Sequence, residues 1–140
     1  MKILVVDDEP KIREVIKEYA EFSGYEVTEA ADGMSAVGLC KLNDYDLIIM
    51  DIMMPKLDGI QAMIRIREKS NVPVILLTAK GEDSDKVLGL TVGADDYITK
   101  PFNPIEVSAR VKSQLRRYMQ LGGGSVRPDV IRVGGIELDD

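Results

Sequence analysis

The sequence contains no histidine and no tryptophan, and Cys40 is its only cysteine among 140 residues. A single cysteine excludes a disulfide within the chain. Because Cys40 lies in an apolar pattern with Val37 and Leu39, we expect it to be a small buried hydrophobic residue. The absence of histidine excludes imidazole-based catalytic triads, metal sites with histidine ligands, and formation of a phosphohistidine on this chain.

Long hydrophobic runs are also missing. The longest apolar runs are short, such as Ile3–Val6 and Val74–Leu77. None approaches the ~20 residues that a membrane helix needs. The chain enters a strand-like run directly after Met1-Lys2, without the pattern of a signal peptide. We therefore expect a cytoplasmic protein with no membrane partner. Acidic residues outnumber basic ones by 24 to 18, and the net charge of -6 argues against non-specific DNA binding by this chain.

Short apolar runs rich in β-branched residues alternate with longer amphipathic stretches. The runs Ile3–Val6 and Leu47–Met50 are wholly apolar and predict buried strands, whereas the half-polar Val27–Ala30 predicts an edge strand. The pattern as a whole predicts strands over Ile3–Val6, Val27–Ala30, Leu47–Met50, Val72–Leu77 and Asp96–Thr99, and helices over Glu9–Phe22, Met34–Leu42, Ile60–Glu68, Ser84–Val92 and Pro104–Met119.

Five strand–helix units in succession predict an α/β fold, with a parallel sheet covered by helices on both faces. The positions of the apolar and half-polar strands favour a flavodoxin-like doubly wound five-stranded sheet of order 2-1-3-4-5, although a Rossmann order would give a similar pattern. Local signals support the limits of the first helix: Asp8 is a plausible N-cap, Pro10 suits the first turn, and Gly24 suits the C-cap.

The composition changes near residue 119, and we expect residues 1–119 to form one domain. Residues 120–130 include Gly122-Gly123-Gly124-Ser125 and predict a flexible linker. Residues 131–140 contain one further strand-like piece, Ile131-Arg132-Val133, and are interpreted as the start of a second, truncated domain. A disordered natural tail is the alternative.

Polar residues follow the predicted strands at the sheet edge where open α/β folds bind their ligands. Asp7 and Asp8 follow the first strand, Asp51 the third, Thr78 the fourth and Lys100 the fifth. Any one of these residues alone is better explained as a helix cap, a turn residue or a solvated charge. Their joint placement at four strand ends is what indicates a site.

Such a cluster predicts phosphoryl chemistry. Three carboxylates close together repel one another and need a cation, and an all-oxygen set of ligands favours Mg²⁺. A metal-bound carboxylate such as that of Asp51 can attack a phosphate donor as a nucleophile and form an aspartyl phosphate. The Thr78 hydroxyl and the Lys100 ammonium could then bind the phosphate oxygens on which charge develops.

Four segments of the chain carry most of these polar residues: Val5-Val6-Asp7-Asp8-Glu9, Asp51-Ile52-Met53-Met54-Pro55-Lys56-Leu57-Asp58-Gly59, Leu77-Thr78-Ala79 and Lys100-Pro101-Phe102. In the same order they resemble the motifs of response regulator receiver domains. The resemblance spans residues 2–118. It implies a signalling domain, not an enzyme, in which Asp51 accepts a phosphoryl group from a sensor histidine kinase.

The same resemblance implies a role for each site residue. Asp8 and Asp51 would bind Mg²⁺ directly, Asp7 would bind it through water, and Met53 would offer its backbone carbonyl. It also implies that Thr78 and Tyr97 form a switch pair, that Lys100 binds the phosphate, and that the Lys100–Pro101 peptide is cis.

The segment Gly93–Phe102 is further similar to winged-helix transcription factors of the OmpR/PhoB type, and Ile131–Leu138 resembles the opening strand of their DNA-binding domain. This resemblance implies a homodimer formed on phosphorylation through the fourth helix, fifth strand and fifth helix, and DNA binding only through the missing C-terminal domain. The residues that match the paired charges of that dimer face are Lys86, Asp95, Asp96, Glu106, Arg110 and Arg117. A solvated helix face is the alternative explanation for these charges.

Three rival functions can be weighed on the sequence. A phosphatase of the haloacid dehalogenase type would need a second aspartate two residues after the nucleophile, where this chain has Met53. A flavodoxin would need a phosphate-binding loop after the first strand, whereas Asp7-Asp8-Glu9-Pro10 would repel a phosphate in the absence of a metal. A stand-alone receiver that acts only through protein contacts remains open.

Overall fold

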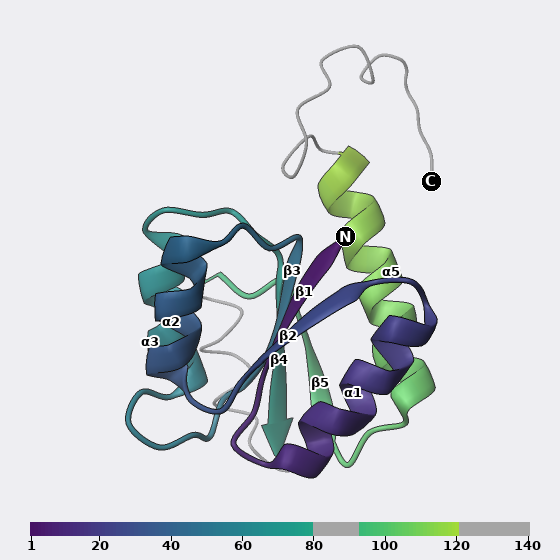
Figure 1. The fold of residues 1–140 in the computed structure, drawn as a ribbon, viewed down its shortest axis with the longest axis horizontal. Coiled ribbons are helices and arrows are strands. Elements are labelled where there is room, and N and C mark those ends of the chain that lie inside the picture. The colour runs from purple at the N-terminus through teal and green to yellow at the C-terminus, as the bar shows by residue number, and fades with distance from the viewer. Residues whose placement is uncertain (80–92, 121–140) are drawn as a thin grey trace.

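The computed structural model describes residues 1–79 and 93–120 (Figure 1). The helix predicted over Ser84–Val92 and the segment 121–140 lie outside the described residues. In chain order the elements are β1 (Lys2–Val6), α1 (Pro10–Phe22), β2 (Glu26–Ala30), α2 (Gly33–Leu42), β3 (Leu47–Asp51), α3 (Gly59–Arg67), β4 (Val74–Ala79), β5 (Asp96–Lys100) and α5 (Pro104–Gln120).

The strands form one five-stranded sheet in the order β2-β1-β3-β4-β5, and every neighbouring pair is parallel. The predicted fold class and strand order are therefore confirmed. The register aligns the carboxyl ends of the strands, since Val6 pairs with Met50, Asp51 with Leu77, and Thr78 with Thr99. Residues that follow these pairs thus meet along one edge of the sheet.

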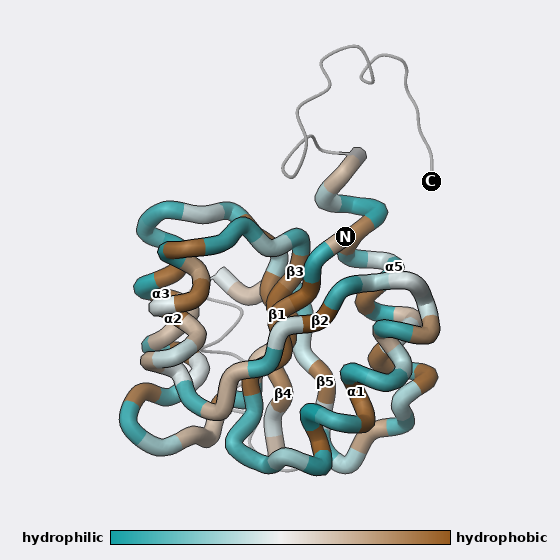
Figure 2. Tube along the Cα trace, in the orientation of Figure 1, coloured by the Kyte–Doolittle hydropathy of each residue, from teal (hydrophilic) through white to brown (hydrophobic). Residues whose placement is uncertain are grey.

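Side chains of the central strands alternate between two hydrophobic cores, as the two-residue period of a strand requires. Leu4, Ile48 and Leu76 belong to the core beneath α2 and α3. Ile3 and Ile49 belong to the core beneath α1 and α5. Figure 1 shows these helix pairs on opposite faces of the sheet, and Figure 2 shows hydrophobic residues concentrated along the strands between them. None of the helices in the described ranges is long and apolar enough to cross a bilayer.

Helix α1 ends at Phe22 as predicted, but its N-cap lies one residue later than predicted. Gly24 adopts φ +92, and the amides of Gly24 and Tyr25 donate to the carbonyls of Glu21 and Ala20, which closes the helix end. The N-cap is Glu9, so the prediction of Asp8 as N-cap was wrong. Because Pro10 occupies the first helical position, the cap falls on the residue before it.

Strand β3 is one residue longer than predicted and ends on Asp51, the candidate phosphoacceptor. Strand β4 starts at Val74, two residues later than predicted, since Pro73 has no amide hydrogen for the ladder. Helix α3 begins directly beside the end of β3: Asp58 caps it by accepting a bond from the Gln61 amide at 2.8 Å, and the Gly59 amide donates to the Ile52 carbonyl at 2.9 Å. The end of the β3–α3 loop is therefore held against the start of that loop.

Candidate functional site

The carboxylates of Asp7, Asp8 and Asp51 converge at the carboxyl edge of the sheet. One oxygen from each can be chosen so that all three lie within 4.8 Å of one another. Asp7 and Asp51 are buried, with exposed fractions of 0% and 5%, whereas Asp8 is exposed. The cluster therefore has a buried floor of two acids and an opening to solvent at the third.

Lys100 reaches into this cluster from the end of β5. Its Nζ lies 2.9 Å from Asp7 Oδ2, 3.3 Å from Asp51 Oδ2 and 3.6 Å from Glu9 Oε1. The Lys100–Pro101 peptide is cis, as the family resemblance implied. The lysine thus faces the two buried carboxylates together, which the sequence could predict only from the expected strand order.

Burial and mutual repulsion shift the protonation of the site. Burial raises the pKa of Asp51 to about 6, and the charge of Asp7 adds to this rise while Lys100 opposes it. Burial also raises the pKa of Asp7, against the lowering effect of the Glu9 amide and of Lys100. Burial lowers the pKa of Lys100, but its contacts with Asp7 and Asp51 outweigh this and leave the pKa raised. One ammonium thus only partly offsets the acidic charge.

The donor set fits a small hard cation. Asp7 Oδ1 accepts a bond from the Glu9 amide at 2.9 Å, but the buried Asp7 Oδ2 has no hydrogen-bond donor of good geometry among the described residues, although it is ion-paired with Lys100. Buried carboxylate oxygens are costly when they are not fully satisfied. Oxygen ligands from three carboxylates, with an opening for water, match the preference of Mg²⁺.

Of the other predicted site residues, Thr78 lies at the same edge of the sheet, whereas Tyr97 lies further back on β5, where it pairs with Leu76. Thr78 is buried at the end of β4, and its hydroxyl donates to the Ala79 carbonyl at 3.2 Å. Tyr97 on β5 is half-buried and packs against the core beneath α2 and α3. The Met53 side chain is 63% exposed, so it stands in solvent beside the end of β3.

Arg110 and Asp96, two of the residues predicted to form a dimer face, are paired within the chain. Arg110 Nη1 lies 2.6 Å from Asp96 Oδ1, and Arg110 Nη2 lies 3.4 Å from Glu106 Oε2, one helical turn away. Arg117 is exposed near the end of α5, and Lys86 lies outside the described residues. A dimer through this face would start from charges that already have partners.

Asp95 has a different environment from the other predicted dimer residues. Its Oδ2 accepts bonds from Arg67 Nη2 and from the Val74 amide, both at 2.8 Å. Arg67 also donates to the carbonyls of Gly93 and Val72. The Asp95 carboxylate therefore ties the start of β5 to β4 and α3.

Two residues at the site were not singled out from the sequence. Glu9 lies 3.6 Å from Lys100, and Arg13 Nη1 donates to the Asp7 carbonyl at 2.6 Å. Glu9 belongs to the motif that carries the family resemblance, so that motif was a signal for it. Arg13 had none, because its contact with β1 depends on how α1 packs on the sheet.

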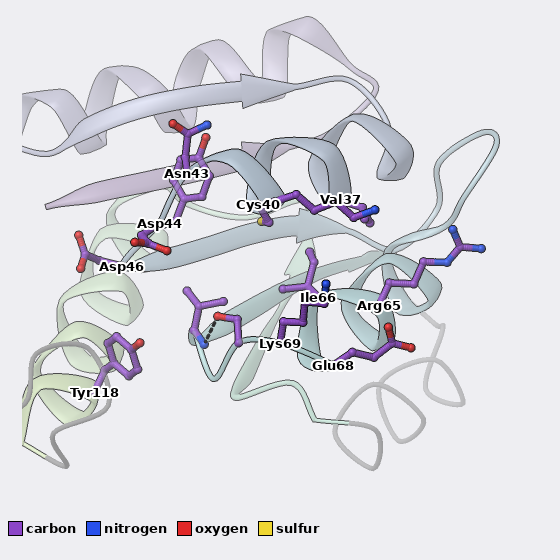
Figure 3. A pocket seen from close by; sticks show the side chains of 14 residues that line it. Val37, Cys40, Asn43, Asp44, Asp46, Arg65, Ile66, Glu68, Lys69 and Tyr118 are labelled. Atoms are coloured by element: carbon purple, nitrogen blue, oxygen red, sulfur yellow. Dashed lines mark hydrogen bonds between the residues drawn. The ribbon is translucent and has the colours of Figure 1, made fainter.

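A hollow bounded by described residues lies away from this chemistry. It measures about 970 Å³, and its lining includes Asp44 and Asp46 before β3, Val72 before β4 and Tyr118 near the end of α5 (Figure 3). These residues mark the amino ends of the strands, whereas Asp51 marks a carboxyl end. Cys40 also lines it, and burial raises the pKa of that thiol to about 11, so it stays protonated. The acidic cluster is the site that carries reactive groups.

A doubly wound sheet of this order, with an acidic cluster and a lysine at its carboxyl edge, defines a receiver-type signalling domain. The family model for the response regulator receiver domain matches residues 3–112, and the chain belongs to that family. It is similar to a receiver domain of a Francisella response regulator, with 44% identity and a TM-score of 0.78 over 83% of this chain and 97% of that one. A receiver domain protein from Methanospirillum hungatei gives 30% identity and a TM-score of 0.82 over 86% and 98%.

Curated relatives are longer than this chain. The regulatory protein VanRc of Enterococcus gallinarum is 47% identical over 92% of this chain and 56% of its own length. The transcriptional regulatory protein SrrA of Staphylococcus aureus is 44% identical over 99% of this chain and 59% of its own length. The chain thus spans little more than half of these relatives, which are response regulators of the OmpR/PhoB type.

Proposed function

We propose that this receiver domain accepts a phosphoryl group on Asp51 from the phosphohistidine of a sensor kinase. The observation that carries the proposal is the position of Asp51 Oδ2, 3.3 Å from Lys100 Nζ and within the acidic cluster. An Asp51 oxygen would form the new bond to phosphorus while the phosphorus–nitrogen bond of the donor breaks, and the electron pair of that bond stays on the imidazole. The domain itself would be the acceptor, so each phosphoryl transfer would modify the domain and would not convert an external substrate.

Asp8 and Asp51 would hold Mg²⁺ directly, Asp7 would hold it through water, and Met53 would offer its carbonyl. When bound, the ion would neutralise the acidic charge and stabilise the phosphoryl oxygens during transfer. Ionised carboxylates are needed both as ligands and as the nucleophile. Because the pKa of Asp51 is about 6, the nucleophile itself is mostly ionised at neutral pH.

Lys100 and Thr78 would bind the phosphoryl oxygens after transfer. Lys100 would keep its contact with the Asp51 side chain, and the Thr78 hydroxyl would leave the Ala79 carbonyl that it now contacts at 3.2 Å. Movement of Thr78 would open space for Tyr97 and change the surface of β5 and α5. We propose that this change promotes a homodimer, and that a longer protein with a C-terminal DNA-binding domain converts dimerisation into control of transcription.

Intact-mass measurement after incubation with acetyl phosphate tests the proposal directly. With Mg²⁺ the protein should gain one phosphoryl group, and without Mg²⁺ the gain should be lost. Asp51→Asn should abolish uptake because the nucleophile is gone, and Asp8→Ala should raise the Mg²⁺ concentration required because one ligand is gone. Uptake by Asp51→Asn at the wild-type rate would refute the assignment.

A further inference from the structure

Arg13 makes two hydrogen bonds in different directions from the fourth position of α1. Its Nη1 donates to the backbone carbonyl of Asp7 at 2.6 Å, and its Nε donates to Glu29 Oε1 on β2 at 3.1 Å. The side chain is only 17% exposed. Lys17 Nζ lies 3.5 Å from the other oxygen of Glu29, so the glutamate holds two cations from α1. An arginine that is solvated for charge alone would not be fixed in this way.

The atom that Arg13 contacts lies between the two acids of β1–α1. The Asp7 carbonyl and the Asp8 amide belong to one planar peptide unit, so a bond to that carbonyl fixes the plane that joins the two residues. On the other side of the same residue, the Asp7 amide donates to the Ala30 carbonyl of β2 at 3.1 Å. Strand β2 therefore holds the amide of Asp7 and Arg13 holds its carbonyl.

The Asp8 side chain depends on this backbone for its position. Its carboxylate makes no hydrogen bond or ion pair with the residues that the structure describes. The turn below it is not fixed by a helix cap either, because the N-cap Glu9 makes no side-chain capping bond. Asp7, Asp8 and Asp51 lie close enough to repel one another, and the Arg13 contact holds the Asp7–Asp8 peptide in place beside them.

We propose that Arg13 is a positioning residue for the cation site: it fixes the Asp7–Asp8 peptide so that both carboxylates face Asp51. The inference rests on the proposed function, because it assigns Arg13 a part in Mg²⁺ binding. The planar guanidinium offers donors in two fixed directions, one for Asp7 and one for Glu29, and an ammonium offers no such fork. Glu29 in turn sets the orientation of the guanidinium.

Calorimetric titration of the phosphate-free protein with Mg²⁺ tests the role without any chemical step. Arg13→Met keeps the apolar stem and removes both bonds, and it should weaken Mg²⁺ binding by about tenfold, as removal of a supporting contact behind metal ligands does. Arg13→Lys should fall between Arg13→Met and the wild type. Lys17→Met is the matched control: it removes a cation from Glu29 but leaves the Asp7 contact, and it should bind Mg²⁺ as the wild type does.

A second measurement separates positioning from simple structural support. With acetyl phosphate, Arg13→Met should need more Mg²⁺ for half-maximal phosphorylation yet approach the wild-type rate at saturation. Should Arg13→Met fail to fold, Glu29→Ala frees the guanidinium while leaving Arg13 in place, and it should weaken Mg²⁺ binding where Glu29→Gln, which keeps an acceptor, does not. Wild-type Mg²⁺ affinity in Arg13→Met, or in Glu29→Ala if that variant is needed, would overturn the inference. A wild-type protein that binds no Mg²⁺ would instead refute the proposed function, and the inference with it.

Discussion

The ionised carboxylate of Asp51 should destabilise the metal-free folded protein by a measurable free energy. Burial and the charge of Asp7 raise its pKa to about 6, above the ordinary value for an aspartate in an unfolded chain, which is about 4. The folded state therefore holds the Asp51 proton more tightly than the unfolded state. The stabilisation linked to that proton is complete below about pH 4 and is lost as the pH rises through about 6.

We predict that Asp51→Asn raises the free energy of unfolding of the metal-free protein by roughly 1–3 kcal/mol at pH 7.5, because asparagine does not ionise. The gain should shrink toward zero at pH 4, where wild-type Asp51 is protonated, and Mg²⁺ should also reduce it by neutralising the wild-type carboxylate. Urea unfolding at the two pH values measures it. The exposed Asp44→Asn is the control and should change little. Equal effects of Asp51→Asn at both pH values would contradict the assignment.

Met53 should make the aspartyl phosphate long-lived. Water must approach the phosphorus in line to hydrolyse it, and an exposed thioether two residues after Asp51 cannot orient that water by hydrogen bonding. Replacing Met53 with Asn or Glu should speed phosphate loss by roughly threefold or more. The decay of the phosphorylated mass measures the rate. Met34→Asn, at another half-exposed methionine on α2, should decay as the wild type does, and an unchanged rate in both Met53 variants would remove the basis for the prediction.

At the scale of elements, two glycines on the α2–α3 side should respond to alanine in opposite ways. A Cβ on Gly59 would lie 2.2 Å from the Asp51 carbonyl oxygen, so α3 could not begin where it does without moving the end of β3. A Cβ on Gly38, at an exposed position of α2, would meet nothing within 4 Å.

We predict that Gly59→Ala lowers the free energy of unfolding by roughly 2 kcal/mol or more and slows phosphorylation, because the strain falls on the residue that carries the nucleophile. Gly38→Ala should instead raise the free energy of unfolding by about 0.5–1 kcal/mol through helix propensity, with phosphorylation unchanged. Thermal melts and intact-mass assays would measure both. A tolerated Gly59→Ala would mean that the helix start can shift freely.

The helices and strands were predictable from sequence where a local pattern or a single residue determines where an element lies or ends. The wholly apolar runs Ile3–Val6 and Leu47–Met50 identified two interior strands of the sheet. Gly24 identified the end of α1, because only a glycine adopts φ +92 readily. The start of α1 was missed by one residue because Asp8 and Glu9 are both able to cap, and the choice depends on where Pro10 falls. The start of β4 was missed because β-propensity does not report which amides enter the ladder.

The site was predictable to the same extent as the strand order. Asp7, Asp51 and Lys100 could be placed together because the order of parallel strands decides which ends are neighbours. Arg13 could not be found in this way, since its bond to Asp7 depends on the packing of α1 against β1 and β2. The pairing of Asp95 with Arg67 likewise depends on tertiary structure, and the sequence around Asp95 does not predict it.

At the scale of the whole molecule, Arg110 should contribute to a phosphorylation-dependent dimer. Arg110 already contacts Asp96 and Glu106 within its own chain, so a twofold interface would exchange these pairs for equivalent pairs across the axis. Because each exposed pair contributes roughly 0–1 kcal/mol, the unphosphorylated dimer should be weak and the phosphorylated one sensitive to salt.

We predict that treatment with beryllofluoride and Mg²⁺ shifts the protein toward a dimer in sedimentation velocity. Arg110→Ala should weaken this dimer and raise its dissociation constant by about threefold or more. High salt should have the same direction of effect. Arg65→Ala, an exposed arginine on α3, is the control and should dimerise as the wild type does. A strictly monomeric treated protein at high concentration would count against the proposed dimer.

DNA recognition should require more than this chain. Affinity for DNA depends largely on lysine and arginine neutralising phosphates, whereas 24 acidic residues here outweigh 18 basic ones. In a longer protein of the length of its relatives, a basic module tethered beyond Gly122-Gly123-Gly124 would be brought to a second half-site by dimerisation of the receivers, so phosphorylation would raise affinity through effective concentration. A gel-shift titration with the 140-residue chain should therefore show no sequence-selective binding.

The longer protein should bind a direct-repeat site more tightly when phosphorylated. Arg110→Ala should reduce that gain, although the substitution leaves the DNA-binding surface unchanged. Selective binding by this chain, or a longer protein indifferent to Asp51→Ala, would show that the output does not work through receiver dimerisation.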